Sequence, residues 1–254
     1  MQALSASELL AVWERARAQS LTTQALELLA AVSPDSSWDD LEKLSVGRRD
    51  AQLLTLREAL FGSRLTAVAL CPQCGQQLEL GFDAAEIRVD RELSLEPLTV
   101  TTGGYVARFR LPNSKDLETI GERDEMQTDS SAMSRRLLSR CLLEIQNKGR
   151  RPAPETLRDL PPALIADITA EMEKADPQAN VELDLSCADC GHRWLSTFDI
   201  VSFLWSEIDN WAGRILREVC ALSSAFGWRE SDILAMSAQR RQLYLEMIGS
   251  AVRQ

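Results

Sequence analysis

The sequence contains a single histidine, His192, among its 254 residues. Histidine is the commonest general acid or base at neutral pH, so such chemistry here would have to rest on carboxylates. No nucleophile elbow or phosphate-cradling glycine loop is present, and no carboxylate is marked out by its sequence context. We therefore expect a protein that is not an enzyme.

Long apolar runs are also missing. No stretch approaches the roughly 20 consecutive apolar residues of a membrane-spanning helix, and no secretory signal is recognisable. We expect a cytoplasmic protein with no membrane partner. In that compartment thiols stay reduced, which disfavours disulfide bonds.

Positive charge is scarce for a protein that would bind nucleic acid. The chain has 28 basic against 38 acidic side chains, a net charge of -10. Residues 175–199 hold five acids and one base, Arg193. A phosphate backbone attracts Lys and Arg, so we expect no nucleic-acid partner.

What the sequence does have is four of its six cysteines in two matching pairs. Cys71-Pro-Gln-Cys74-Gly75 and Cys187-Ala-Asp-Cys190-Gly191 each separate two thiols by two residues and add a glycine. This pattern is typical of a zinc knuckle, in which a tight turn aims both thiolates at one metal. One knuckle supplies two ligands and tetrahedral zinc needs four. We predict a structural zinc site formed by Cys71, Cys74, Cys187 and Cys190.

Other interpretations of the pairs remain open. A thioredoxin-like redox motif lies at a strand-to-helix junction, whereas both pairs lie between strand-like segments. Disulfides are disfavoured by the expected compartment, and a zinc ion shared between subunits would satisfy the same pattern. His192 lies close enough to Cys190 to replace a ligand. Four cysteines already fill the shell, so we expect it to face solvent.

The periodicity of apolar residues predicts an α+β fold that is mostly α. Hydrophobic residues make up 45% of the chain, which is enough to bury a core. We predict helical N- and C-terminal units around a small antiparallel sheet that carries the two knuckles. The predicted segments are a helical unit at 1–62, a knuckle sheet from 63–111 and 179–199, a helical insertion at 112–178 and a helical unit at 200–254.

Local signals mark several elements. Ser5-x-x-Glu8 is a capping box, and Gly62 is placed to end a helix that runs from Asp50 to Phe61. Gly103-Gly104 predicts the turn of a hairpin from Leu98 to Leu111. We expect this hairpin to share one sheet with the knuckles.

The two remaining cysteines carry no chemistry in this interpretation. Cys141 lies on the apolar stripe of a helix predicted from Ser134 to Gln146, and Cys220 lies in a long helix after Phe198. We predict both as core thiols.

That long helix carries more apolar residues than one packing face needs. Trp205 and Trp211 are six positions apart, so they cannot both point into the same contact. One interpretation is a helix buried on several sides within its own protein. The other is a docking face, for which we predict Trp205, Trp211 and Trp228 as partner-binding residues.

Several short segments together resemble one family. They are Leu56–Leu65 before the first cysteine pair, Phe109-Arg-Leu-Pro112, Ala175-Asp-Pro-Gln178, Cys187 to Trp194, and Ala225-Phe-Gly-Trp228 with Arg240-Arg-x-x-Tyr244. They are similar to baseplate hub assembly chaperones of the T-even phage type, which are encoded in contractile injection system gene clusters. The resemblance covers nearly the full length.

The resemblance implies a non-enzymatic role in assembling the baseplate and hub of a phage-tail-like machine, with baseplate or hub proteins as partners. It carries over no catalytic residues, and only the four paired cysteines as metal ligands. Two alternatives remain: a structural baseplate component retained in the particle, and a zinc-ribbon regulator that binds nucleic acid. The acidic second knuckle argues against the regulator.

Overall fold

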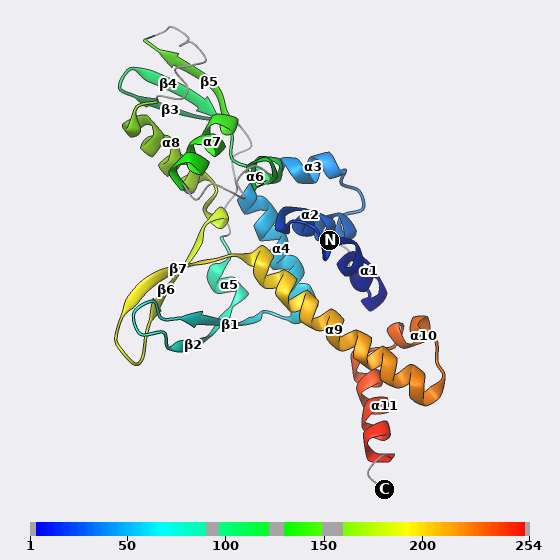
Figure 1. Cartoon of the computed structure of the whole chain (residues 1–254). Coiled ribbons are helices and arrows are strands. Elements are labelled where there is room, and N and C mark those ends of the chain that lie inside the picture. Colours follow the sequence, from blue (N-terminus) through cyan, green and yellow to red (C-terminus); the bar gives the residue numbers. More distant parts are fainter. Residues whose placement is uncertain (1–3, 90–96, 122–129, 149–159, 252–254) are drawn as a thin grey trace. The chain divides into compact units, whose positions relative to one another are not determined.

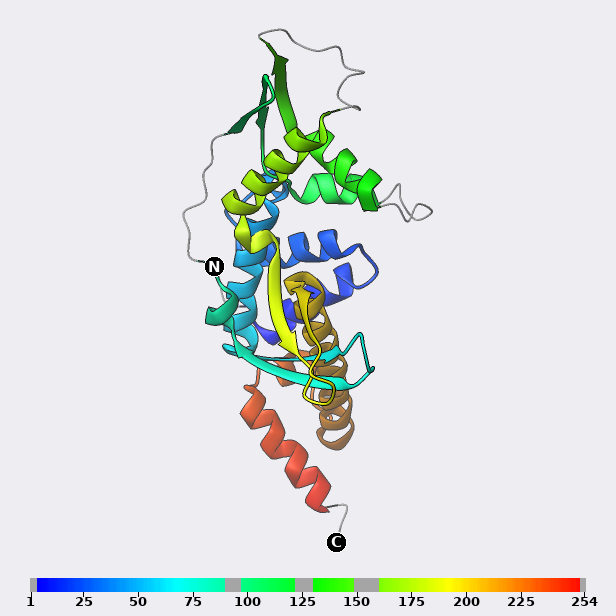
Figure 2. The same ribbon diagram turned by 90° about the vertical axis from the view of Figure 1, so that its left-hand side faces the viewer.

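The computed structural model describes residues 4–89, 97–121, 130–148 and 160–251. The chain forms two compact units: a terminal unit of Met1–Ser36 with Val201–Gln254, and a central unit of Ser37–Ile200. Helices predominate over small antiparallel sheets in both views (Figures 1 and 2), which confirms the predicted fold class. The finer division into four segments stays a prediction.

The terminal unit is helical. It contains α1 (Ala6–Ala16), α2 (Leu21–Val32), α9 (Ile200–Phe226), α10 (Glu230–Leu234) and α11 (Ala238–Ala251). The predicted capping box starts α1, because the Ser5 hydroxyl accepts from the Glu8 N–H at 3.3 Å and the Ser5 N–H donates to the Glu8 carboxylate at 2.8 Å. Within the described ranges, no helix is both long and apolar enough to cross a membrane.

Apolar side chains of α1, α2, α9 and α10 are buried in this unit. They include Leu9, Leu10, Val12, Leu26, Leu29, Leu204, Ile208, Ile215, Leu222, Ile233 and Leu234. Cys220 is not among them, because it lies one position beside the buried Val219 and is exposed, so its assignment to the core was wrong. Gly227, with φ of +70°, follows the end of α9, and its N–H donates to the Ser223 carbonyl at 2.8 Å.

The central unit begins with helices and then alternates strands and helices. Its elements are α3 (Trp38–Lys43), α4 (Val46–Phe61), β1 (Arg64–Leu70), β2 (Gln77–Asp83), α5 (Ala84–Ile87), β3 (Leu98–Thr102), β4 (Tyr105–Phe109), α6 (Ser114–Gly121), α7 (Ser130–Cys141), β5 (Leu142–Asn147), α8 (Pro162–Ala175), the short 3-10 helix η2 (Pro177–Ala179), β6 (Val181–Ser186) and β7 (Arg193–Phe198). Gly62 ends α4 as predicted, with its N–H bonded to the Glu58 carbonyl.

The predicted hairpin forms β3 and β4, with the two glycines at its turn. Its predicted place in the knuckle sheet was wrong: the described strands form a β1-β2 sheet, a β3-β4-β5 sheet and a β6-β7 sheet. Figure 1 shows α7 and α8 beside the three-stranded sheet. Phe109 and Ala107 of β4 and Ile168 of α8 are buried in the core that these elements share.

The helix predicted from Ser134 to Gln146 was also wrong in its second half. The helix ends at Cys141, and Leu142–Asn147 form β5, in which Ile145 pairs with Ala107 of β4. The segment from Leu142 to Ile145 is too short for its apolar pattern to distinguish a helix from a strand. Its pairing with β4 makes it a strand. Cys141 itself is fully buried, as predicted, and burial raises the pKa of its thiol to about 12.

A buried carboxylate starts α4. Ser45 caps this helix, which therefore begins four residues before the predicted Asp50, and Asp176 accepts from the Gly47 N–H at 2.9 Å. A Cβ at Gly47 would lie 2.1 Å from the Asp176 carboxylate, so only glycine fits there. Asp176, which is 3% exposed, thus joins the segment before β6 to the start of α4.

Asp50 lies nearby on α4 and makes the stability of this unit depend on pH. Burial raises the pKa of Asp50 to about 6; Arg49 lowers it, while Asp199 and Asp176 raise it. The folded state therefore binds a proton that the unfolded chain releases near pH 3.8, so the free energy of unfolding falls as pH rises from about 4 to about 6.

We expect Asp50→Asn to reduce this slope in urea unfolding measured at pH 4, 5, 6 and 7. The slope should not vanish, because burial raises the pKa of Asp176 as well. Asp35→Asn, at an exposed loop position, is the matched control and should keep the wild-type slope. If Asp50→Asn kept the wild-type dependence of the free energy of unfolding on pH, a group other than Asp50 would be the one that binds the proton.

Candidate metal centre

Both cysteine pairs form loops of the same geometry at the turns of two hairpins. The glycine after each second cysteine has a positive φ, +74° at Gly75 and +71° at Gly191. Its N–H donates to the carbonyl of the first cysteine, at 2.9 Å for Cys71 and 3.0 Å for Cys187. A Cβ is strained at such φ values, which explains the glycine that follows each pair.

The four thiols come together although residues 75–186 separate the two loops. All four sulfur atoms lie within 4.8 Å of one another. Cys71 Sγ is 3.7 Å from Cys190 Sγ, and Cys74 Sγ is 3.6 Å from Cys187 Sγ. Sulfurs bound at about 2.3 Å in a tetrahedron around zinc are about 3.8 Å apart. The four cysteines could therefore hold one metal ion, and all six cysteines of the chain are free thiols.

Backbone amides surround the sulfurs. Burial raises the pKa of Cys71, but the N–H groups of Cys74 and Gln73 and the thiols of Cys74 and Cys190 lower it, to about 7. An N–H of Gln76 also lowers the pKa of Cys74, yet burial and the three neighbouring thiols raise it to about 12. A bound cation would favour the ionised form of all four thiols.

The donor set determines what such a centre can do. Four thiolates complete a tetrahedral shell and leave no position for water or substrate, which is typical of structural rather than catalytic metal sites. His192, which we expected to face solvent, is half-buried, and its ring stacks on Trp194 with centroids 5.8 Å apart. Its backbone N–H donates to Cys190 Sγ.

The hairpins that carry the loops share only a small apolar layer. Phe82 of β2 contacts Phe198 of β7 edge-to-face, with ring centroids 5.5 Å apart. Leu65 and Leu185 are buried, whereas the other apolar residues of this layer are mostly half-buried. A layer this small stabilises little on its own, so a metal at the loops would contribute a large share of the stability.

Sequence reasoning missed one buried ion cluster. Asp116 is 1% exposed and accepts from Arg110 at 2.5 and 2.9 Å and from Arg140 at 2.9 Å. It also accepts from the Asn113 N–H at 3.2 Å. The carboxylate thereby ties α6 to the end of β4 and to α7. No local sequence pattern predicts this cluster, since Arg140 lies 24 residues from Asp116 along the chain.

The tryptophans predicted to bind a partner lie in the terminal unit. Trp205 and Trp211 are half-buried on α9. Trp228 is also half-buried; its ring stacks on Phe226 at 4.5 Å and meets Tyr244 edge-on at 4.8 Å. The partner role of all three tryptophans stays a prediction.

Two hairpins bring together four thiols that could hold one metal ion, and such a donor set would leave no open coordination position. The chain belongs to the family described as T4 bacteriophage base plate protein, whose model matches residues 5–205. The match includes both knuckles and ends within α9. No curated protein and no solved structure matches the chain. Family membership supports a baseplate-related role and contact with other baseplate components.

Proposed function

We propose that this chain is a non-enzymatic assembly factor, a chaperone for the baseplate hub of a contractile, phage-tail-like injection system, and that it acts in the bacterial cytoplasm. The observation that carries the proposal is the family match over residues 5–205, which contains the complete four-cysteine centre. The net charge of -10 is in keeping with protein partners rather than nucleic acid.

The metal in this proposal is zinc with a structural role. A tetrahedral set of four thiolates suits zinc or iron. Zinc has no redox chemistry, and it stabilises a hairpin pair without exposing a reactive centre. The chain's own part is to place two rigid loops and to direct backbone N–H groups at the sulfurs.

A second candidate is a structural baseplate component retained in the finished particle. The family description, a base plate protein, favours it. The two candidates differ in one observable: an assembly factor is absent from purified particles, whereas a component is present in fixed stoichiometry.

The test is deletion of the coding sequence from a host that carries the whole gene cluster. We expect sheathed, contractile particles to disappear from electron micrographs and to return with the wild-type gene. Quantitative mass spectrometry of purified particles should then find the chain absent. Normal particle numbers in the deletion strain would overturn both candidates, and a stoichiometric amount of the chain in particles would select the second.

A further inference from the structure

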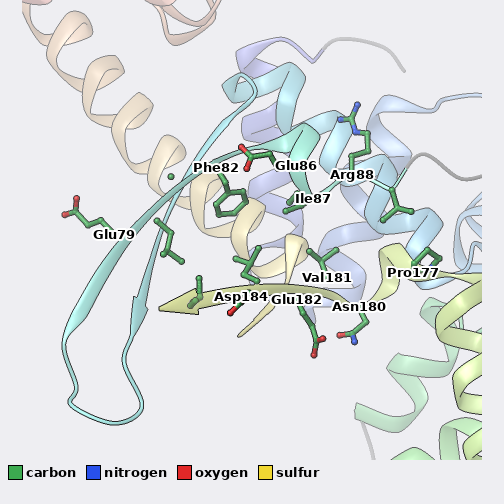
Figure 3. Close-up of a pocket in the computed structure, with 15 residues that line it drawn as sticks. Glu79, Phe82, Glu86, Ile87, Arg88, Pro177, Asn180, Val181, Glu182 and Asp184 are labelled. Carbon is green, nitrogen blue, oxygen red and sulfur yellow. The ribbon is translucent and has the colours of Figure 1, made fainter. Parts of the chain in front are cut away.

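A groove lies between the two knuckle hairpins, within the central unit. Its volume is about 610 Å³; β2 lines it with residues 79–82, and β6 lines it with residues 181–185. Figure 3 shows Phe82 and Ile87 on one side of it and Val181 on the other. The walls are thus two strands that are distant in sequence.

The lining has the pattern of a strand edge. Side chains alternate between the faces of a strand, so a groove against one face contacts every second residue. Here consecutive residues of both strands line the groove. Among the described strands β2 pairs only with β1, and β6 only with β7, so each has one edge without a strand partner. Such edges add a further strand readily.

Both ends of the groove are fixed. At one end, the buried Gln178 accepts from the Val89 N–H at 2.7 Å and donates to the Ile87 carbonyl at 3.2 Å. At the other end, β2 and β6 lead to the two cysteine loops. A metal ion held by the four cysteines would therefore also set the position of the two walls.

The rim of the groove is acidic. Glu79 and Glu182 are exposed, and neither has an ion-pair partner within the described ranges. The groove's one lining cation among the described residues, Arg88, is held by Glu58 at 2.6 Å. In Figure 3 the carboxylates of Glu79 and Glu182 point away from the apolar centre. An occupant would therefore meet an apolar floor and uncompensated negative charge at the edges.

We propose that this groove accepts an extended segment of a partner protein as an added β-strand, and that apolar and basic residues alternate along that segment. Backbone hydrogen bonds to the free edges of β2 and β6 supply affinity. Apolar side chains contact Phe82, Ile87 and Val181, and Lys or Arg side chains reach Glu79 and Glu182. The inference rests on the proposed function for the identity of the partner, a baseplate component, but not for the chemistry of the site.

The test uses the purified, metal-loaded full chain and a fluorescein-labelled peptide of four Lys-Val repeats, read by fluorescence anisotropy at low salt. We expect saturable binding that a Glu-Val peptide does not show. A Lys-Val peptide N-methylated at every second residue should bind at least about tenfold more weakly, because it lacks several of the backbone N–H donors that the added strand needs. Charge alone would leave its binding unchanged.

Glu79→Lys/Glu182→Lys should weaken binding about tenfold, since two attractive rim charges become repulsive. Glu14→Lys/Glu173→Lys changes the net charge equally at exposed positions outside the groove, and should bind within about twofold of wild type. Absent peptide binding, equal binding of the N-methylated peptide, or equal losses in the two double variants would each overturn the proposal. Particle assembly in the deletion strain is a separate readout, so failure of the groove and failure of the proposed function are distinguishable.

Discussion

Cys74→Ser and Cys190→Ser are each expected to abolish metal binding and to unfold the two knuckle hairpins. Structural zinc contributes roughly 10 to 16 kcal/mol of apparent binding free energy in small sites. The whole net stability of a domain is about 5 to 15 kcal/mol. The apolar layer around Phe82 and Phe198 is too small to replace that contribution.

The measurement is the metal content of each purified variant, with hydrogen exchange of β1, β2, β6 and β7 followed in parallel. We expect about one zinc per wild-type chain, no zinc in either serine variant, and loss of protection in all four strands. Cys141→Ala and Cys220→Ala are the matched controls, because both thiols lie outside the cluster. Full metal content in either serine variant would rule out a centre shared by the two knuckles.

Asp116→Asn is expected to destabilise the central unit by about 1.5 to 3 kcal/mol, the range for hydrogen bonds to charged groups. Asp116 is buried, whereas the side chains of Arg110 and Arg140 are 34% and 36% exposed, so solvent screens the charges that the replacement leaves without a counter-ion. Burial raises the pKa of Asp116, but hydrogen bonds from Arg110, the Asn113 N–H and Arg140 bring it below its usual value. This stabilisation is therefore present above about pH 4 and is lost as pH falls through the lowered pKa.

Urea unfolding of Asp116→Asn, followed by circular dichroism at pH 7, measures the effect. The control is Asp184→Asn, which removes an ion pair with Arg193 whose side chains are 57% and 70% exposed. That variant should lose less than about 1 kcal/mol. If both variants unfold at the same urea concentration, the Asp116 cluster does not hold α6, β4 and α7 together.

Much of the fold followed from local chemistry in the sequence. The capping box at Ser5, the helix end at Gly62 and the Gly103-Gly104 turn are each decided by neighbours along the chain, and each was predicted correctly. The convergence of the two knuckles was inferred from stoichiometry, because each supplies half of a tetrahedral shell. The structure places their sulfurs at the spacing which that argument requires.

The predictions that were wrong or missing mostly depended on contacts between segments that are distant in the sequence. The strand at Leu142–Asn147 exists because β4 pairs with it, which its own apolar pattern does not reveal. The fold brings Arg110 and Arg140 to Asp116, and it brings together the distant strands β2 and β6 that line the groove. Cys220 was misplaced because one position on a helix separates a buried face from an exposed one.

The structure gives a physical role to two of the short motifs that carry the family resemblance. In Ala175-Asp-Pro-Gln178, Asp176 accepts from the Gly47 N–H in the first turn of α4, and Gln178 joins Ile87 to Val89. In Phe109-Arg-Leu-Pro112, Phe109 fills the core beside α8 and Arg110 binds Asp116. These residues hold the central unit together around the hairpins, which favours a structural role for the motifs.

We propose that one zinc ion joins two hairpins of a single chain through four thiolates. The measurement for this proposal is X-ray absorption at the zinc edge of the purified full-length protein, with zinc and protein concentrations determined on the same sample. We predict a first shell of four sulfur atoms at about 2.3 Å and about one zinc per chain. A shell that contains nitrogen or oxygen, or one zinc for every two chains, would contradict the account.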